Sequence, residues 1–303
     1  MNKKHLVIIL GPTGIGKTDL STGIALELGT EIISCDSRQF YKEMSIGTAV
    51  PSQEQLNKVK HHFIHHIPIT TSYSASRFEQ DFISLSEKLF RKYDVLLMTG
   101  GSGLYIDAAC GKMDDIPDVD PDVREKYLRK YREEGLESIR SDLRLLDPDH
   151  YRVADLKNHK RILRALEICE STGQPYSSYL RKKGKTRDFG IIKIGLRMNR
   201  DELYERINAR VDKMVAQGLE KEAKDLITYR HINALNTVGY KEFFSYMDGD
   251  ITRGKAIELV KRNSRRYAKR QMTWWARDNE IEWFHPGEKE NIIDYITLKT
   301  TST

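Results

Sequence analysis

Cysteine is scarce in this chain, and long hydrophobic runs are missing. Its 303 residues include three cysteines, Cys35, Cys110 and Cys169, far apart and without Cys-x-x-Cys spacing. They indicate neither a disulfide framework nor a zinc site, and they fit a reducing compartment. The N-terminal apolar run Leu6–Leu10 is shorter than the core of a signal peptide and ends in Gly-Pro, so we expect a cytoplasmic protein.

The overall composition excludes two further classes. With 39% hydrophobic and 31% charged residues, the chain is neither a membrane protein nor a disordered one. The formal net charge of +6 is unevenly distributed, because residues 253–277 contain nine basic residues and one acidic residue. Tyr267, Trp274 and Trp275 are interleaved with these charges. Such a segment is typical of a nucleic-acid-binding surface, and the alternative is a solvated helix face.

Short apolar runs alternate with helical patterns. Strands are expected at Leu6–Leu10, Glu31–Ser34, Val95–Met98 and Ile191–Leu196, and a helix at Thr18–Leu28. Residues 123–172 have charged, helix-forming sequence without a strand-like run, so we expect an inserted helical domain over residues 118–187 within a core of residues 1–117 and 188–303. A long helical pattern covers 201–230, and further helices are expected over 238–278.

One motif identifies the loop after the first strand. Gly11-Pro12-Thr13-Gly14-Ile15-Gly16-Lys17-Thr18 matches G-x-x-x-x-G-K-[ST] between a predicted strand and a predicted helix. Backbone N–H groups of such a loop surround a phosphate, the lysine adds a positive charge, and the threonine hydroxyl can bind Mg²⁺. The sequence therefore predicts an α/β fold with a P-loop NTPase-like parallel sheet core and an inserted all-helical domain.

The residues that follow the other predicted strands limit the reactions that this fold could catalyse. Nucleotide hydrolases of this class end an apolar strand with an Asp that holds Mg²⁺, whereas Val95–Met98 continues into Thr99-Gly100-Gly101-Ser102. A carboxylate, Asp36, instead follows the second strand, at the sheet edge where parallel sheets place their chemistry. Taken alone, Asp36 could equally cap a turn.

Further motifs resemble those of a known family. The sequence reads Asp-Ser-Arg-Gln-Phe-Tyr from Asp36, Gly-Gly-Ser-Gly-Leu-Tyr from Gly100, Val-Gly-Tyr-Lys from Val238, and Lys-Arg-Gln-Met-Thr-Trp from Lys269. Together with the phosphate loop, these motifs closely resemble bacterial tRNA dimethylallyltransferases, in order and over nearly the whole chain. The Cys/His zinc module of some eukaryotic relatives does not occur.

The resemblance implies a function. The family transfers a dimethylallyl group from dimethylallyl diphosphate to N6 of the adenosine 3′ to the anticodon, in tRNAs that read codons beginning with U, giving N6-dimethylallyladenosine (i6A). By resemblance, Asp36 is the general base, and Ser102, where the family usually has Thr, lies beside the reacting groups. Lys17 and Arg206 hold the diphosphate with the loop Gly11–Thr18, and Thr18 binds Mg²⁺. Arg206 could instead form a surface ion pair with Glu202.

The resemblance also implies a tRNA anticodon stem-loop as partner. The expected tRNA-binding residues are Asp36, Ser37, Arg38, Gln39, Ser102, Arg124, Lys160, Arg161, Ile162, Leu163, Arg164, Asn236, Thr237, Val238, Gly239, Tyr240, Lys241, Lys269, Arg270, Gln271, Met272, Thr273, Trp274, Trp275, Ala276 and Arg277. We expect one of the two tryptophans to be exposed. No protein partner is implied, so the sequence predicts a monomer.

Two positions depart from the family pattern, and a cluster of histidines raises the alternative of a metal site. His65 and Val50 stand where the family commonly has Asp and Lys. A metal site at His61, His62, His65 and His66 is disfavoured, because neighbouring histidines point in different directions and no Cys or acid completes the set.

Two other functions remain open at this point. One is a small-molecule or nucleoside kinase of the same fold, which the missing acid after the Val95–Met98 strand disfavours. The other is a non-catalytic RNA-binding protein, which leaves the phosphate loop and Asp36 without a role.

Overall fold

The computed structural model describes residues 4–117, 119–180 and 184–301. The chain divides into two compact units, Met1–Cys110 with Arg187–Thr303 and Gly111–Thr186. The second unit overlaps the inserted domain predicted at 118–187 but begins earlier, at Gly111. Within the described ranges, no helix is long and apolar enough to cross a membrane.

The first unit is built on a six-stranded parallel sheet in the order β3-β2-β4-β1-β5-β6. Its strands are β1 (His5–Leu10), β2 (Ile32–Ser34), β3 (His61–His62), β4 (Val95–Gly100), β5 (Gly190–Leu196) and β6 (Ile281–Phe284). Every residue of β1 is buried, which explains the uninterrupted apolar run that follows His5. The four predicted strands are confirmed. β3 was missed because its two histidines give no apolar signal, and β6 was missed because its mostly apolar sequence is only four residues long.

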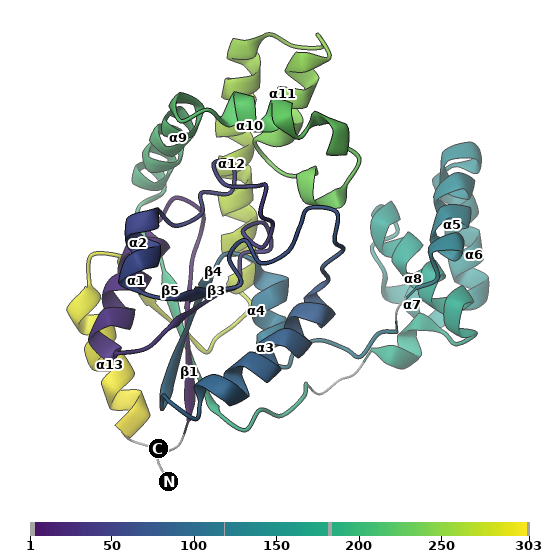
Figure 1. Ribbon diagram of the computed structural model, residues 1–303. Helices are drawn as coiled ribbons and strands as arrows, with labels where there is room; N and C mark the ends of the chain where they lie inside the picture. Colours follow the sequence, from purple (N-terminus) through teal and green to yellow (C-terminus); the bar gives the residue numbers. More distant parts are fainter. Residues whose placement is uncertain (1–3, 118, 181–183, 302–303) are drawn as a thin grey trace. The chain divides into compact units, whose positions relative to one another are not determined.

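Helices cover both faces of this sheet (Figure 1). α1 (Lys17–Leu28) and α13 (Lys289–Thr301) lie on one side, and α3 (Ala75–Leu89) and α4 (Gly103–Ala109) on the other. Ile24 of α1 and Ile292 of α13 pack against Val7 and Ile9 of β1 in one hydrophobic cluster. The remaining helices of this unit are α2 (Gln53–Lys58), α9 (Arg200–Ala216), α10 (Leu219–Asp225), α11 (Tyr240–Met247) and α12 (Arg253–Trp275).

The expectation of one long helical pattern over 201–230 was wrong in its length. α9 ends at Ala216, and Gly218 has a left-handed backbone with φ of 106° before α10 begins at Leu219. This turn lets Leu219 pack with Tyr240 in a second hydrophobic cluster. The predicted apolar face of α9 is confirmed, since Leu203, Ile207 and Val211 are buried and Met214 and Val215 are partly buried against the second cluster.

The second unit is helical, as expected. It contains α5 (Pro121–Glu134), α6 (Leu136–Leu146), α7 (Pro148–Val153) and α8 (His159–Thr172). Its core includes Tyr127, Ile139, Leu143 and Leu166. Asp120, Asp147 and Asn158 accept hydrogen bonds from backbone N–H groups at the starts of α5, α7 and α8, which stabilises those ends.

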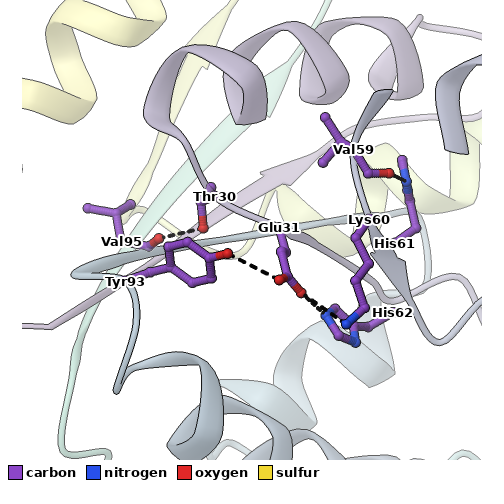
Figure 2. Close-up of polar contacts among 8 residues, drawn as sticks. All are labelled: Thr30, Glu31, Val59, Lys60, His61, His62, Tyr93 and Val95. Atoms are coloured by element: carbon purple, nitrogen blue, oxygen red, sulfur yellow. Dashed lines mark hydrogen bonds and ion pairs between the residues drawn. The ribbon is translucent and has the colours of Figure 1, made fainter. Parts of the chain in front are cut away.

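The histidine-rich segment belongs to the edge of the sheet. His61 Nδ1 lies 2.8 Å from the carbonyl oxygen of Val59, and His62 Nε2 lies 2.5 Å from Glu31 Oε2 (Figure 2). His65 Nε2 lies 3.3 Å from the carbonyl oxygen of Met44, while the His66 ring packs against Phe40. These side chains thus have separate partners, and the described residues include no group of three His, Cys or acidic side chains that could hold a metal.

Glu31 ties this sheet edge together. The Tyr93 hydroxyl donates to Glu31 Oε1 at 3.1 Å, and Lys60 Nζ lies 3.6 Å from Oε2 (Figure 2). Burial alone would raise the pKa of Glu31, but hydrogen bonds from His62 and Tyr93 and the nearby positive charges outweigh it, so its pKa lies below the ordinary 4.5. The ionised carboxylate is therefore preferred in the folded state.

This depressed pKa predicts an acid-dependent contribution to stability. Its stabilisation is present above the unfolded-state pKa near 4.5 and is lost as pH falls through the folded-state pKa. We expect Glu31→Gln to lower the urea midpoint at neutral pH and to flatten the decline of that midpoint as pH drops from about 7 to about 3. Glu87→Gln, at an exposed position of α3, is the control. Parallel midpoint curves for wild type and Glu31→Gln would contradict the assignment.

Candidate functional site

The phosphate loop connects β1 to α1. Gly14 and Gly16 have φ of 83° and 100°, a backbone region that suits glycine, and a Cβ at Gly14 would lie 2.8 Å from Ile207 Cγ1. The first turn of α1 begins at Lys17, so the positive end of a 12-residue helix faces the loop. Sequence alone predicts this arrangement correctly, because the motif is local.

Lys17 is held inside its own loop. Its Nζ donates to the carbonyl oxygens of Gly11 and Pro12 at 2.8 and 3.0 Å. Burial of the ammonium, followed by the nearby charge of Arg210, lowers its pKa to about 8, although Asp36 and Cys35 act in the opposite direction. A phosphate bound in the loop would place negative charge next to this buried ammonium group.

Two arginines reach the loop from α9, one helical turn apart. Arg206 Nε donates to the carbonyl oxygen of Gly14 at 3.2 Å, and Arg210 Nη1 donates to Thr13 Oγ1 at 3.2 Å. Within the part of the chain that the structure describes, Arg206 forms no ion pair with Glu202. Burial lowers the pKa of Arg210, and Asp36 opposes this shift. Both guanidinium groups therefore lie where an anion in the loop would meet them.

Asp36 and Ser102 are brought together by neighbouring strands. β2 pairs with β4, so Asp36 after β2 and Ser102 after β4 emerge at the same sheet edge. Ser102 Oγ accepts a hydrogen bond from the Ser37 backbone N–H at 3.0 Å and donates to Ser37 Oγ at 3.1 Å. Asp36 Oδ1 accepts from the Arg38 N–H at 3.0 Å, so the turn-capping interpretation holds as a local role. Among residues 4–117, 119–180 and 184–301, Oδ2 of Asp36 receives no hydrogen bond.

A cavity of about 810 Å³ joins these groups. Lys17, Thr18, Asp36, Arg206 and Arg210 all line it. From α12, the side chains at Val260, Ser264, Tyr267 and Gln271 line it as well, at the spacing of one helix face. The cavity therefore holds both the predicted anion-binding groups and the predicted base.

Sequence reasoning missed Tyr267 as a site residue. Its hydroxyl lies beside Ser102, and Arg270 lies 5.7 Å from its ring centroid. Burial, followed by the negative charge of Asp36, raises its pKa to about 12, so the hydroxyl keeps its proton. The signal was available in the regular spacing of Ser264, Tyr267 and Gln271.

A loop over residues 45–49 forms one wall of the cavity. Glu222 of α10 accepts hydrogen bonds from the backbone N–H groups of Ser45, Ile46 and Gly47 at 2.8–3.0 Å, and from the Tyr240 hydroxyl at 2.7 Å. On the other side, Gln39 Nε2 donates to the carbonyl oxygens of Thr48 and Ala49 at 3.2 and 3.0 Å. The backbone of this partly buried loop is thereby hydrogen-bonded from two directions.

The basic segment on α12 divides into two halves. Its first half is ion-paired, because Arg253, Lys255 and Lys261 contact Glu220, Glu258 and Asp212 at 2.6–2.7 Å. In its second half Arg266, Lys269, Arg270 and Arg277 are exposed and form no ion pair within the described residues. The available positive charge therefore lies in the half nearer the helix C-terminus.

The predicted RNA-binding residues fall into exposed and buried sets. Trp274 is 40% exposed and Trp275 is 3% exposed, which agrees with the expectation of one exposed tryptophan. In the helical unit, Arg124, Lys160 and Arg161 are exposed. The side chains that are instead buried, and so unavailable for direct contact, are Ile162, Leu163, Tyr240, Gln271 and Trp275.

A divalent cation is compatible with the cavity. Thr18, in the first turn of α1, contributes a hydroxyl to the lining beside the anion-binding groups. Mg²⁺ commonly takes few protein ligands and completes its shell with phosphate oxygens and water. The donor set fits an ion that arrives with a phosphorylated substrate.

The comparisons with known proteins indicate one enzyme family. The IPP transferase family model matches residues 39–278. The chain is 50% identical to tRNA dimethylallyltransferase 1 of Bacteroides thetaiotaomicron over 97% of this chain and 96% of the relative. It is 52% identical to tRNA dimethylallyltransferase 1 of Porphyromonas gingivalis over 96% of this chain and 98% of the relative.

Solved structures with a similar fold carry related descriptions. The tRNA isopentenylpyrophosphate transferase of Bacillus halodurans matches with a TM-score of 0.73 and 35% identity, covering 99% of this chain and 98% of the other. A eukaryotic dimethylallyltransferase, described as acting on tRNA, matches with a TM-score of 0.80 and 26% identity over 93% of this chain and 74% of the other.

Proposed function

The chain belongs to the IPP transferase family, and from this membership we propose that it transfers a dimethylallyl group from dimethylallyl diphosphate to N6 of the adenosine 3′ to the anticodon in tRNAs that read codons beginning with U. The products are N6-dimethylallyladenosine and diphosphate. One observation carries the proposal: the phosphate loop and Asp36 line a single cavity, and Ser102 binds the turn that holds Asp36.

The leaving diphosphate is stabilised by the loop and its arginines. As the bond between the allylic carbon and the diphosphate oxygen breaks, positive charge develops on carbon and negative charge on the diphosphate. Loop N–H groups, Lys17, Arg206 and Arg210 are positioned to balance that negative charge. Mg²⁺, held by the Thr18 hydroxyl and diphosphate oxygens, would neutralise further charge when bound.

The acceptor amine needs a base. The lone pair of the adenine N6 amine is delocalised into the ring, so proton removal must accompany formation of the new C–N bond. Asp36 takes that proton at Oδ2, the oxygen that the turn leaves available. Ser102 orients the amine, and the Tyr267 hydroxyl lies beside Ser102.

The exposed half of α12 provides the positive charge for the tRNA phosphates. The adenine must leave its stack to enter the cavity, because N6 cannot reach Asp36 inside a stacked anticodon loop. Lys160, Arg161 and Arg164 of the helical unit contact the same RNA. The monomeric state stays a prediction.

A direct assay tests this function. Purified protein is incubated with bulk tRNA and either labelled dimethylallyl diphosphate or a labelled nucleoside triphosphate. We expect label to pass only from the prenyl donor, and mass spectrometry of digested tRNA to show dimethylallyladenosine. Label passing from the triphosphate to an acceptor would indicate a kinase instead. Retention of tRNA without any transfer would indicate a binding protein.

Substitution of Asp36 separates its two roles. We expect Asp36→Ala to lower kcat by about 10²- to 10⁴-fold, because the proton acceptor is removed, while the Kd for tRNA changes little. Asp36→Asn keeps an oxygen for the Arg38 N–H and serves as the control for turn geometry. Restored turnover in Asp36→Asn would show that capping, and not proton removal, is the function of this residue.

Charge removal from α12 tests the RNA surface. We expect Lys269→Ala and Arg270→Ala each to weaken tRNA binding and to reduce the slope of log K against log salt by about 1, because each variant gives up one ionic interaction with a phosphate. Lys255→Ala is the matched control, since Lys255 lies on the same helix but is paired with Glu258 at 2.7 Å. An equal slope in all three variants would place the tRNA elsewhere.

A further inference from the structure

Gln271 occupies an unusual place on the basic helix. It follows two exposed cations, Lys269 and Arg270, yet it is itself 6% exposed. A carboxamide buried to this extent costs free energy unless both its oxygen and its NH₂ group are hydrogen-bonded. The contacts of this amide therefore reveal its role better than its position within the basic segment does.

Both ends of the amide are satisfied by loops of the site. Gln271 Oε1 accepts from the Thr13 backbone N–H at 2.9 Å, and Nε2 donates to the carbonyl oxygen of Gly101 at 2.8 Å. An amide of this length accepts and donates at once; an ionised glutamate only accepts, and methionine does neither in any useful strength. The orientation of the side chain is fixed by these two partners.

The two loops that Gln271 joins carry the chemistry of the site. Thr13 belongs to the phosphate loop, and Gly101 immediately precedes Ser102. A Cβ at Gly101 would lie 2.3 Å from Gln271 Nε2, so the absence of a side chain there is what allows the amide to enter. Because the Thr13 N–H is already bonded to Gln271, it is not among the loop amides that a diphosphate can use.

α12 contacts the segment that follows β4 at more than one point. Tyr267 lies beside Ser102, and Trp274 Nε1 donates to Asp107 Oδ2 of α4 at 3.1 Å. Gln271 lies between these two contacts and is the one that also reaches the phosphate loop. Lys269 and Arg270, which precede Gln271 on the same helix, are exposed, and Arg270 also lines the cavity.

We propose that Gln271 is a positioning residue that sets the spacing between the phosphate loop and the Ser102 loop, and so links diphosphate binding to the helix that bears the exposed cations. The inference rests on the proposed function. It gives Gln271 a positioning role in place of the direct RNA contact predicted from the sequence. Gln271 touches no reacting atom; it acts through the backbone at Thr13 and Gly101.

Two substitutions at Gln271 test this role. We expect Gln271→Met and Gln271→Glu to lower kcat/KM for dimethylallyl diphosphate by about 10- to 100-fold, because loop displacements of about 1 Å have effects of this size. The Kd for tRNA and its salt slope should stay within about twofold of wild type, since no phosphate contact is removed. Gln53→Met, at an exposed glutamine of α2, is the matched control.

The glutamate variant has a distinctive pH dependence. A protonated carboxyl accepts through one oxygen and donates through its O–H, as the amide does, and burial raises the pKa of such a group. The activity of Gln271→Glu relative to wild type should therefore rise as pH falls from about 8 to about 6, while that of Gln271→Met should not. Taking the ratio to wild type removes any pH dependence that the variants share with it.

A third variant acts from the opposite side of the contact. Gly101→Ala keeps the glutamine at position 271 but puts a Cβ 2.3 Å from its Nε2. It should therefore lower kcat/KM for dimethylallyl diphosphate as the Gln271 variants do, and it tests the contact even if a Gln271 variant fails to fold. Unchanged donor kinetics in folded variants would overturn the inference. So would weakened tRNA binding at unchanged kcat, or identical pH ratios for the Glu and Met variants. Absence of prenyl transfer by the wild type would instead overturn the proposed function.

Discussion

The parallel register of β1 with its neighbours is the constraint on which the site depends. Leu10 pairs with Gly100 of β4 on one side and with Gly195 of β5 on the other, so the phosphate loop and the Gly101–Ser102 loop start at the same level. β2 pairs with β4 on the far side and delivers Asp36 to this edge. A slip of one residue would move Gly100 out of register with Leu10 and displace the two loops relative to each other.

Internal hydrogen bonds complete what the register begins. Strand ends fix where each loop leaves the sheet, but not how one loop faces another. Gln39, Glu222 and Gln271 supply that second constraint by bonding backbone groups of other loops, which for Glu222 and Gln271 are distant in sequence. These polar side chains hold the walls of the cavity in place. The cationic side chains around them stay available to bind anions.

The sequence predicts the local parts of this molecule well. The phosphate loop, four of the strands and the placement of Asp36 follow from contiguous patterns, and the structure has them where expected. What depends on distant partners could not be predicted. Nothing near Gln271 in the sequence indicates that Thr13 and Gly101 hold it, and the two-residue strand β3 has no apolar signal. The break at Gly218 was missed because the apolar pattern of α9 continues across it.

The net charge of the basic segment also depends on distant partners that the sequence does not reveal. Counting residues gives one basic segment of uniform sign over 253–277, but Glu220 and Asp212, which lie on other helices, neutralise part of it. The remaining positive charge lies close to the residues of α12 that line the cavity, Tyr267 and Gln271. Attraction of a polyanion falls off within about 8 Å in physiological salt, so only charges this near the cavity can draw a particular nucleotide toward it. Pairing in the first half of α12 therefore concentrates the field where the acceptor base must enter.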